Sequence, residues 1–172
     1  MKKLCYLFAL IFTCNAILVS NYCFADDEQF TYTTNSDNSI TITNYDGSDE
    51  DVVIPQTING KTVTKIASKA FVAEKNMKSI TIPDSVTYIE PGTFQYCSAL
   101  ESITIPDSVT NIGNDVFMFC NNLREVRLPS GMTSIPEGMF SDCGSLADIT
   151  IPDGVTSIGA WAFRSCSSLA DI

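Results

Sequence analysis

The 172-residue sequence contains no histidine, and this absence excludes several kinds of chemistry. Without an imidazole, the chain cannot form a Ser-His or Cys-His nucleophile pair, a histidine metal ligand or a histidine pH switch. Charge is also scarce at 17% of residues, and ten Lys and Arg stand against twenty Asp and Glu. A net charge of −10 disfavours nucleic acids and anionic membranes, which bind basic surfaces. We expect no nucleic-acid partner and no cofactor.

The N-terminus carries an export signal. Lys2 and Lys3 precede an apolar run over residues 4–19, and Cys23-Phe24-Ala25 supplies small residues at the −3 and −1 positions of a cleavage site. This pattern predicts a secretory signal peptide over residues 1–25, cleaved near Ala25, and a secreted or cell-surface protein. The alternative is an uncleaved anchor, but the run is short and interrupted for a membrane span. We expect no stable membrane span after cleavage.

The remainder of the chain is a tandem repeat. Its step of about 23 residues lies within the range of roughly 20–29 residues that is typical of leucine-rich repeats, whose units stack into a solenoid. Four apolar columns keep this step: Phe71, Phe94, Phe117, Phe140 and Phe163; Ile66, Ile89, Ile112, Ile135 and Ile158; Leu100, Leu123, Leu146 and Leu169; and Ile82, Ile105, Leu128 and Ile151. The sequence therefore predicts a leucine-rich repeat solenoid of about five repeats over residues 54–172. A parallel β-helix with coils of similar length is the competing fold.

One repeat unit shows the expected local structure. The unit from Leu100 reads LESITIPDSVTNIGNDVFMFCNN, and its L-x-x-I-x-I opening predicts a strand of a parallel ladder. Pro106 should end the strand because proline cannot donate a ladder hydrogen bond. We expect a short helical turn around residues 115–117. A single unit buries too little apolar surface to offset its ordering entropy, so the units must stack.

The two ends of the repeat array differ. Residues 26–53 alternate apolar and polar side chains at 30–33 and 40–43 around a polar turn at 35–38, which predicts an N-terminal β-hairpin cap. At the other end, residues 169–172 begin a further L-x-x-I, so the C-terminal end is expected to be uncapped. An uncapped repeat end exposes apolar surface, which would allow self-association through it.

The repeat unit resembles a known family. The pattern ITIPDSVTxIxxxxFxxCxxL closely resembles the BspA-like leucine-rich repeats of bacterial surface and secreted proteins, and residues 40–66 resemble the hairpin that commonly precedes them. The resemblance covers about residues 30–172. It implies a secreted or surface-displayed solenoid that binds an extracellular protein or glycan, as in adhesion to host matrix, mucosal surfaces or other cells. It does not identify the ligand.

Two columns contain residues that could form a site. Cys97, Cys120, Cys143 and Cys166 share one column, and four thiols could form disulfides or hold zinc. We favour buried free thiols, because in-register parallel side chains point the same way and disfavour disulfide geometry. Aspartates follow the strand-ending prolines at 84, 107 and 153. We favour turn-forming aspartates that accept bonds from their own backbone over a calcium ladder, and expect no metal site.

The candidate binding residues lie on predicted surfaces. Outward positions of the strands give one set, and aromatic residues that the core does not require give another. The candidates are Glu101, Thr104, Arg124, Glu125, Arg127 and Thr150, with the aromatic residues Tyr96, Phe119 and Trp161. The alternative is an ordinary solvated surface.

We expect no enzyme activity. Glu125 and Asp148 could be imagined flanking a glycosidic bond, but neither lies in an apolar pocket that would separate their pKa values. The sequence thus favours a binding module, with a structural, self-associating repeat segment of a larger surface protein as the alternative. A carbohydrate-active enzyme is the least favoured hypothesis.

Overall fold

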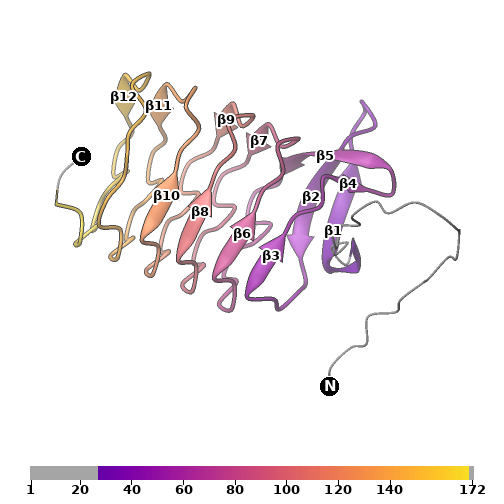
Figure 1. The fold of residues 1–172 in the computed structure, drawn as a ribbon, viewed down its shortest axis with the longest axis horizontal. Helices are drawn as coiled ribbons and strands as arrows, with labels where there is room; N and C mark the ends of the chain where they lie inside the picture. Colours follow the sequence, from indigo (N-terminus) through magenta and orange to yellow (C-terminus); the bar gives the residue numbers. More distant parts are fainter. Residues whose placement is uncertain (1–26, 171–172) are drawn as a thin grey trace, which may run out of the picture.

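The computed structural model describes residues 27–170, which wind into a solenoid of short strands (Figure 1). The coils stack one after another, so that the N-terminal hairpin and the last coil lie at opposite ends of the molecule. The predicted signal peptide and the residues 171–172 lie outside the described part. Within residues 27–170, no helix is long and apolar enough to cross a membrane.

The strands are short and belong to three sheets. A 3₁₀ turn, η1 (Asp27–Gln29), precedes the strands. The strands in chain order are β1 (Phe30–Thr34), β2 (Ile40–Tyr45), β3 (Asp51–Val53), β4 (Thr57–Ile58), β5 (Lys61–Ile66), β6 (Ser79–Thr81), β7 (Tyr88–Ile89), β8 (Ser102–Thr104), β9 (Asn111–Ile112), β10 (Glu125–Arg127), β11 (Ser134–Ile135) and β12 (Ser157–Ile158). One sheet has the order β10-β8-β6-β3, a second has the order β1-β2-β5-β7-β9 with β4 on β5, and β11 pairs with β12. The predicted solenoid with a parallel strand ladder is confirmed.

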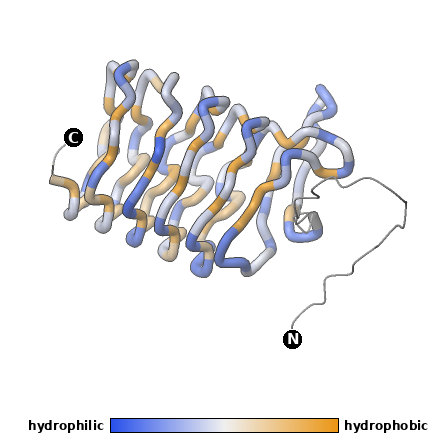
Figure 2. The backbone as a smooth tube through the Cα atoms, viewed as in Figure 1, coloured by the Kyte–Doolittle hydropathy of each residue, from blue (hydrophilic) through white to orange (hydrophobic). Residues whose placement is uncertain are grey.

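The sheet β10-β8-β6-β3 pairs in register at the repeat step. Ile80 lies opposite Ile103, and Ser79 lies opposite Ser102. The middle residue of each strand is buried while its neighbours face solvent, as the alternation of side chains along a strand dictates. Hydropathy along the chain alternates accordingly (Figure 2).

The first strand of this sheet comes from the segment predicted as part of the cap. Val52 of β3 pairs with Ile80 of β6, and the Ile54 amide donates to the carbonyl of Thr81 at 3.0 Å. The extra residues of this first coil form the tight β4–β5 hairpin, which turns at Asn59 and Gly60. Both turn residues have positive φ, as a tight hairpin turn of this kind requires.

A proline interrupts the second sheet. In three coils the equivalent amide bonds to the preceding coil: Glu90 donates to Ile66 at 3.0 Å, Gly113 to Ile89 at 2.9 Å, and Gly159 to Ile135 at 2.8 Å. Pro136 occupies this position in the coil between those of Gly113 and Gly159, and it has no N–H to donate. Strands β11 and β12 therefore form a separate sheet from β9.

The third side of each coil is built from turns, and the predicted short helical turn around residues 115–117 is not present. Alternate amides bond to the next coil instead: Asp115 donates to Glu137, Phe117 to Met139 and Phe119 to Ser141, each at 2.9 Å. Asp115 and Phe119 have φ of 56° and 64°, which no right-handed helix contains. We call this side the turn face.

The core follows the phenylalanine column. Phe71, Phe94, Phe117 and Phe140 are fully buried. Adjacent rings lie one coil apart, with centroids 5.6 Å apart for both Phe94–Phe117 and Phe117–Phe140, nearly parallel. Each coil thus buries its ring between the rings of its neighbours, which is why the units fold only as a stack.

The predicted N-terminal hairpin cap is confirmed. Strands β1 and β2 pair antiparallel, and β2 also pairs in parallel with β5 of the first coil. Phe30 and Tyr45 cover Phe71, with ring centroids 6.4 and 5.4 Å from it. The hairpin therefore closes the N-terminal end of the aromatic column.

Candidate binding surfaces

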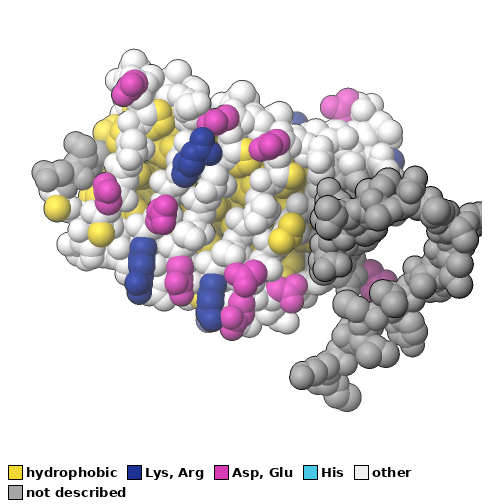
Figure 3. Space-filling view, in the orientation of Figure 1, with side chains coloured by type: hydrophobic (Ala, Val, Ile, Leu, Met, Phe, Trp, Pro, Cys, Tyr) yellow, Lys and Arg dark blue, Asp and Glu magenta, His cyan; other side chains and the backbone are white. Residues whose placement is uncertain are grey.

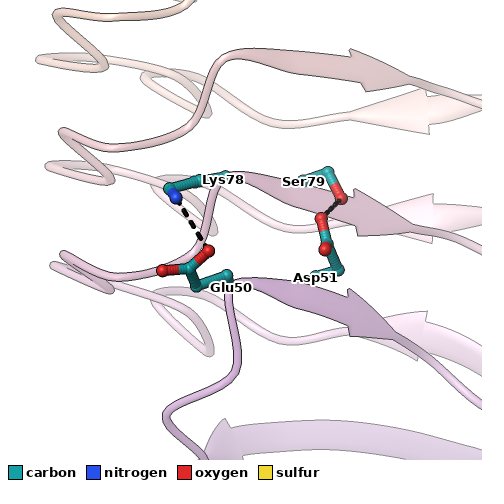
Figure 4. Close-up of polar contacts among 4 residues, drawn as sticks. All are labelled: Glu50, Asp51, Lys78 and Ser79. Atoms are coloured by element: carbon teal, nitrogen blue, oxygen red, sulfur yellow. Dashed lines mark hydrogen bonds and ion pairs between the residues drawn. The ribbon is translucent and has the colours of Figure 1, made fainter.

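The outward side of the sheet β10-β8-β6-β3, together with the residue before each strand, is called the strand face. At each outward position, the equivalent side chains of successive strands line up in a polar column. Acidic and basic side chains alternate along this face (Figure 3). At its N-terminal end, the Lys78 Nζ lies 2.7 Å from Glu50 Oε2, and the Ser79 hydroxyl donates to Asp51 at 2.6 Å (Figure 4). The bond to Glu50 raises the pKa of the Lys78 ammonium. Because both side chains are at least half exposed, solvent screens this ion pair and it adds little to stability.

An open groove of about 590 Å³ crosses the strand face. Its lining includes hydroxyl side chains of β6 and β8 and the charged residues Asp84, Asp107, Glu125 and Arg127. The Arg127 guanidinium pairs with the Asp107 carboxylate at 3.3 Å. Such a lining suits a ligand rich in hydrogen-bonding groups.

Asp107 bonds differently from our prediction. Its carboxylate accepts the amide of Ser130 in the next coil at 2.7 Å, and not an amide of its own turn. This bond is the first cause of the lowered pKa of Asp107, and Arg127 contributes further. The aspartate therefore connects two coils at the edge of the groove.

A second open groove, of about 870 Å³, lies between β10 and the last coil. Residues 148–150 are not paired with β10, although earlier coils pair at this position. Glu125 and Asp148 share a column, and two carboxylates directly opposite each other destabilise strand pairing. Thr150 therefore lines this groove without belonging to the sheet, whereas Arg124, Glu125 and Arg127 line its other wall.

The aromatic candidates lie on the turn face. Tyr96 and Phe119 stack with centroids 4.7 Å apart and planes 7° apart, and Tyr96 is 47% exposed. Trp161 is 64% exposed and belongs to a different column of this face. The structure thus brings Tyr96 and Phe119 together, and separates them from the strand-face candidates.

Sequence reasoning missed two strand-face residues, Glu50 and Asp51. They precede and open β3, which lies within the segment assigned to the cap. The signal was present in Val52-Val53-Ile54-Pro55, which has the pattern of Ile80-Thr81-Ile82-Pro83. The two segments are separated by more than one repeat step, however, because the β4–β5 hairpin lengthens the first coil.

The cysteine column lies in the interior. All four cysteines are buried free thiols, and each Sγ lies 3.0–3.1 Å from the carbonyl oxygen of a phenylalanine in the preceding coil. Among the described residues, no group of three or more His, Cys, Asp or Glu side chains is placed to hold a metal ion.

Comparison with known proteins identifies the repeat type. A family model described as BspA type leucine rich repeat region matches residues 49–170 in six copies, one more than our count of about five. No curated protein sequence matches the chain significantly.

Solved structures share the fold. A leucine rich repeat protein of T. pallidum (TpLRR) is 26% identical, with a TM-score of 0.55 over 84% of this chain and 89% of that one. A leucine rich cell surface protein from Faecalibacterium prausnitzii A2-165 is 30% identical, with a TM-score of 0.60 over 85% of this chain and 53% of that one. The pneumococcal vaccine antigen PcpA shares the fold at 23% identity, with a TM-score of 0.61 over 79% of this chain and 45% of that one. The chain spans about half the length of the last two proteins. With its regular coils, strand face and capped aromatic column, it belongs to the BspA-type leucine-rich repeat family.

Proposed function

We propose that the protein is a secreted or cell-surface binding module that recognises an extracellular protein or glycan through its strand face, as in adhesion. The observation that carries this proposal is the groove of about 590 Å³ across the strand face. Its charged and hydroxyl side chains point to solvent, while the middle residues of the same strands supply the packing. The outward residues can therefore vary without loss of the fold, as binding residues of repeat proteins do.

Glu125 and Arg127 are central to the proposed surface because they line both grooves of the strand face. A ligand lying along the sheet would contact this pair whichever groove it occupied. The neighbouring candidates Glu101, Thr104 and Arg124 would extend the contact across adjacent coils, and Thr150 would extend it into the last one. The 30% identical cell surface protein supports an extracellular location.

The test is a binding screen of the purified protein on arrays of matrix proteins, mucins and glycans. We expect saturable binding to one class. The double variant Glu125→Ala/Arg127→Ala should weaken it at least about tenfold, the loss typical of a central contact. Asn111→Ala, an exposed change in β9 on the second sheet, is the control and should bind normally. Equal binding by both variants would refute the strand face as the site.

A second candidate function is self-association. Ile158 of β12 is 53% exposed, and Trp161 nearby along the chain is 64% exposed. Exposed apolar side chains on a strand at the edge of a sheet promote pairing with another chain. Light scattering across a concentration series would test this idea: Ile158→Asp should abolish any dimer, and a monomer at all concentrations would reject it.

Export is proposed from the N-terminal residues, which lie outside the described part. Expression of the full chain in a bacterial host should give a product outside the cytoplasm that begins near Asp26. N-terminal sequencing of that product would test the proposed cleavage, and an intact Met1 would contradict it.

A further inference from the structure

The Arg127–Asp107 ion pair on the strand face joins two neighbouring coils. The Arg127 Nη2 lies 3.3 Å from Asp107 Oδ2, and both side chains are at least half exposed. Arg127 ends β10, whereas Asp107 follows Pro106 in the preceding coil, just beyond β8. The protein itself thus shows how the turn after a strand of this face holds a guanidinium that comes from the next coil.

One coil earlier, the equivalent carboxylate has no cation. Asp84 lies one repeat step before Asp107, and Thr104 lies one step before Arg127 and pairs with it in register. Threonine carries no charge, and the exposed Asp84 side chain makes no hydrogen bond or ion pair with the described residues. Because the coils repeat, the space above Thr104 corresponds to the space that the Arg127 side chain fills one coil later.

The groove of about 590 Å³ gives a ligand access to this carboxylate. Its lining includes Asp84 and the hydroxyl side chains of Thr81 and Thr104. The charged residues of the lining are three carboxylates and one guanidinium, that of Arg127, which Asp107 already pairs. A cation on Asp84 would therefore extend a row of alternating charges, and the net charge of −10 attracts cations at long range. An anion would be repelled, and a neutral group would gain no ion pair.

We propose that a basic side chain of a protein ligand enters this groove above Thr104 and pairs with Asp84, as Arg127 pairs with Asp107 one coil later. Resting on the proposed function, this site narrows the ligand to a protein rather than a neutral glycan. Arginine fits better than lysine, because its planar fork can donate to the carboxylate and to a neighbouring hydroxyl oxygen at once.

The substitution Thr104→Arg tests the geometry without any ligand, because it supplies a guanidinium from the protein itself. Its effect on the melting temperature should be about 1–2 °C more favourable with Asp84 present than in the Asp84→Asn background, as for an exposed ion pair. Thermal unfolding of the wild type, both single variants and the double variant measures this coupling. An equal effect in both backgrounds would refute the pair.

Binding of a fluorescent nona-arginine peptide, measured by anisotropy at physiological salt, tests the site itself. Asp84→Asn should weaken binding about fivefold, consistent with the loss of one exposed ion pair. Thr104→Arg should weaken it at least as much, because its own side chain then occupies Asp84. Glu137→Gln and Thr110→Arg make the same two charge changes at exposed positions outside the strand face, and both should bind within about twofold of the wild type because salt screens distant charges.

Several outcomes would overturn the site. Equal losses in the test and control variants would show general charge attraction, and unchanged peptide binding by Asp84→Asn would exclude Asp84. Saturable binding of a neutral oligosaccharide that depends on Asp84 would replace the protein ligand by a glycan. An array ligand that depends on Glu125 and Arg127 but not on Asp84 would refute this site alone. The strand face as a whole fails only if Glu125→Ala/Arg127→Ala also leaves every ligand bound, so the two failures are distinguishable.

Discussion

The cysteine column shows how one side chain can connect coils. The Cys120 thiol donates to the carbonyl of Phe94 at 3.1 Å, and Cys97 makes the same bond to Phe71 at 3.0 Å. These bonds require the reduced thiol, because a disulfide sulfur has no hydrogen to donate. Burial raises the pKa of Cys120, Cys143 and Cys166. These three thiols are therefore neutral at neutral pH.

We predict that the four buried thiols react with iodoacetamide far more slowly in the native protein than in the unfolded protein at mildly alkaline pH. The thiolate is the reactive form, and burial raises the pKa of Cys120, Cys143 and Cys166. Burial also shields all four sulfurs from the reagent. Cys166, at 9% exposure the least buried of the four, should react first. Mass spectrometry after timed labelling would check this order, with urea-unfolded protein as the control that labels fully. A native disulfide between any two of the four would contradict the prediction.

Glu74 illustrates a residue whose charge opposes folding. It occupies the cysteine column in the first coil, where burial and Asp46 raise its pKa above the ordinary value of 4.5. A carboxyl group with a raised folded pKa favours the folded state when protonated, so its cost appears as the pH rises above 4.5.

Glu74→Gln should therefore raise the melting temperature at neutral pH by about 1–2 °C, since the group is only partly buried. The difference from the wild type should disappear in mildly acidic solution, below the ordinary pKa of a glutamate, where both side chains are neutral. Thermal unfolding under the two conditions would test this. A variant less stable than the wild type at neutral pH would show that the carboxylate is stabilising.

At the scale of single elements, close backbone contacts between coils decide which residues fit. A Cβ built on Gly113 would collide with the backbone nitrogen of Pro91 in the preceding coil, although Gly113 itself has an ordinary φ. A Cβ built on Gly131 would have no neighbouring atom within 4 Å. The two glycines thus form a natural pair, one required by packing and one in open space.

Gly113→Ala should destabilise the protein by about 1–3 kcal/mol, because the second sheet must shift to admit the methyl group. Gly131→Ala should change stability by less than about 1 kcal/mol, and a small gain is expected from the reduced freedom of the unfolded chain. Urea unfolding of both variants would measure the difference. Equal effects would mean that adjacent coils separate easily at Pro91.

At the scale of the whole molecule, the solenoid is stabilised only through contacts between neighbouring coils. The hairpin protects the first coil, since Tyr45 stacks over the buried Phe71 and its amide donates to Ala70 at 3.0 Å. The free energy of unfolding of such an array is a sum of contributions from the coils and from the interfaces between them. A destabilising substitution at one end should therefore affect the nearest coils most and distant coils least.

Tyr45→Ala should cost about 3 kcal/mol and lower the melting temperature by about 6–12 °C. Hydrogen exchange should show the first loss of amide protection at Ile66 and Phe71, while Val126 remains protected. Tyr96→Ala removes an exposed tyrosine and should cost less than about 1 kcal/mol. Uniform loss of protection along the array would indicate a single cooperative unit.

The repeat length, the fold class, the hairpin cap and the core columns could all be predicted from the amino acids alone. This was possible because stacked coils place equivalent residues in line, so that packing is recorded as a constant period in the chain. The left-handed turn positions could not be recognised, because residues as different as Lys69, Gly92 and Trp161 occupy one of them. The expected helical turn is therefore absent, and turns that are hydrogen-bonded from coil to coil take its place.

Which surface residues meet became known only from the folded molecule. The fold joins Arg127 to Asp107, stacks Tyr96 on Phe119, and places Glu50 and Asp51 on the strand face. It also ends strand pairing at Pro136 and between Glu125 and Asp148. Packing repeats from coil to coil and leaves a periodic signal, whereas surface contacts depend on which side chains happen to face each other across one particular pair of coils.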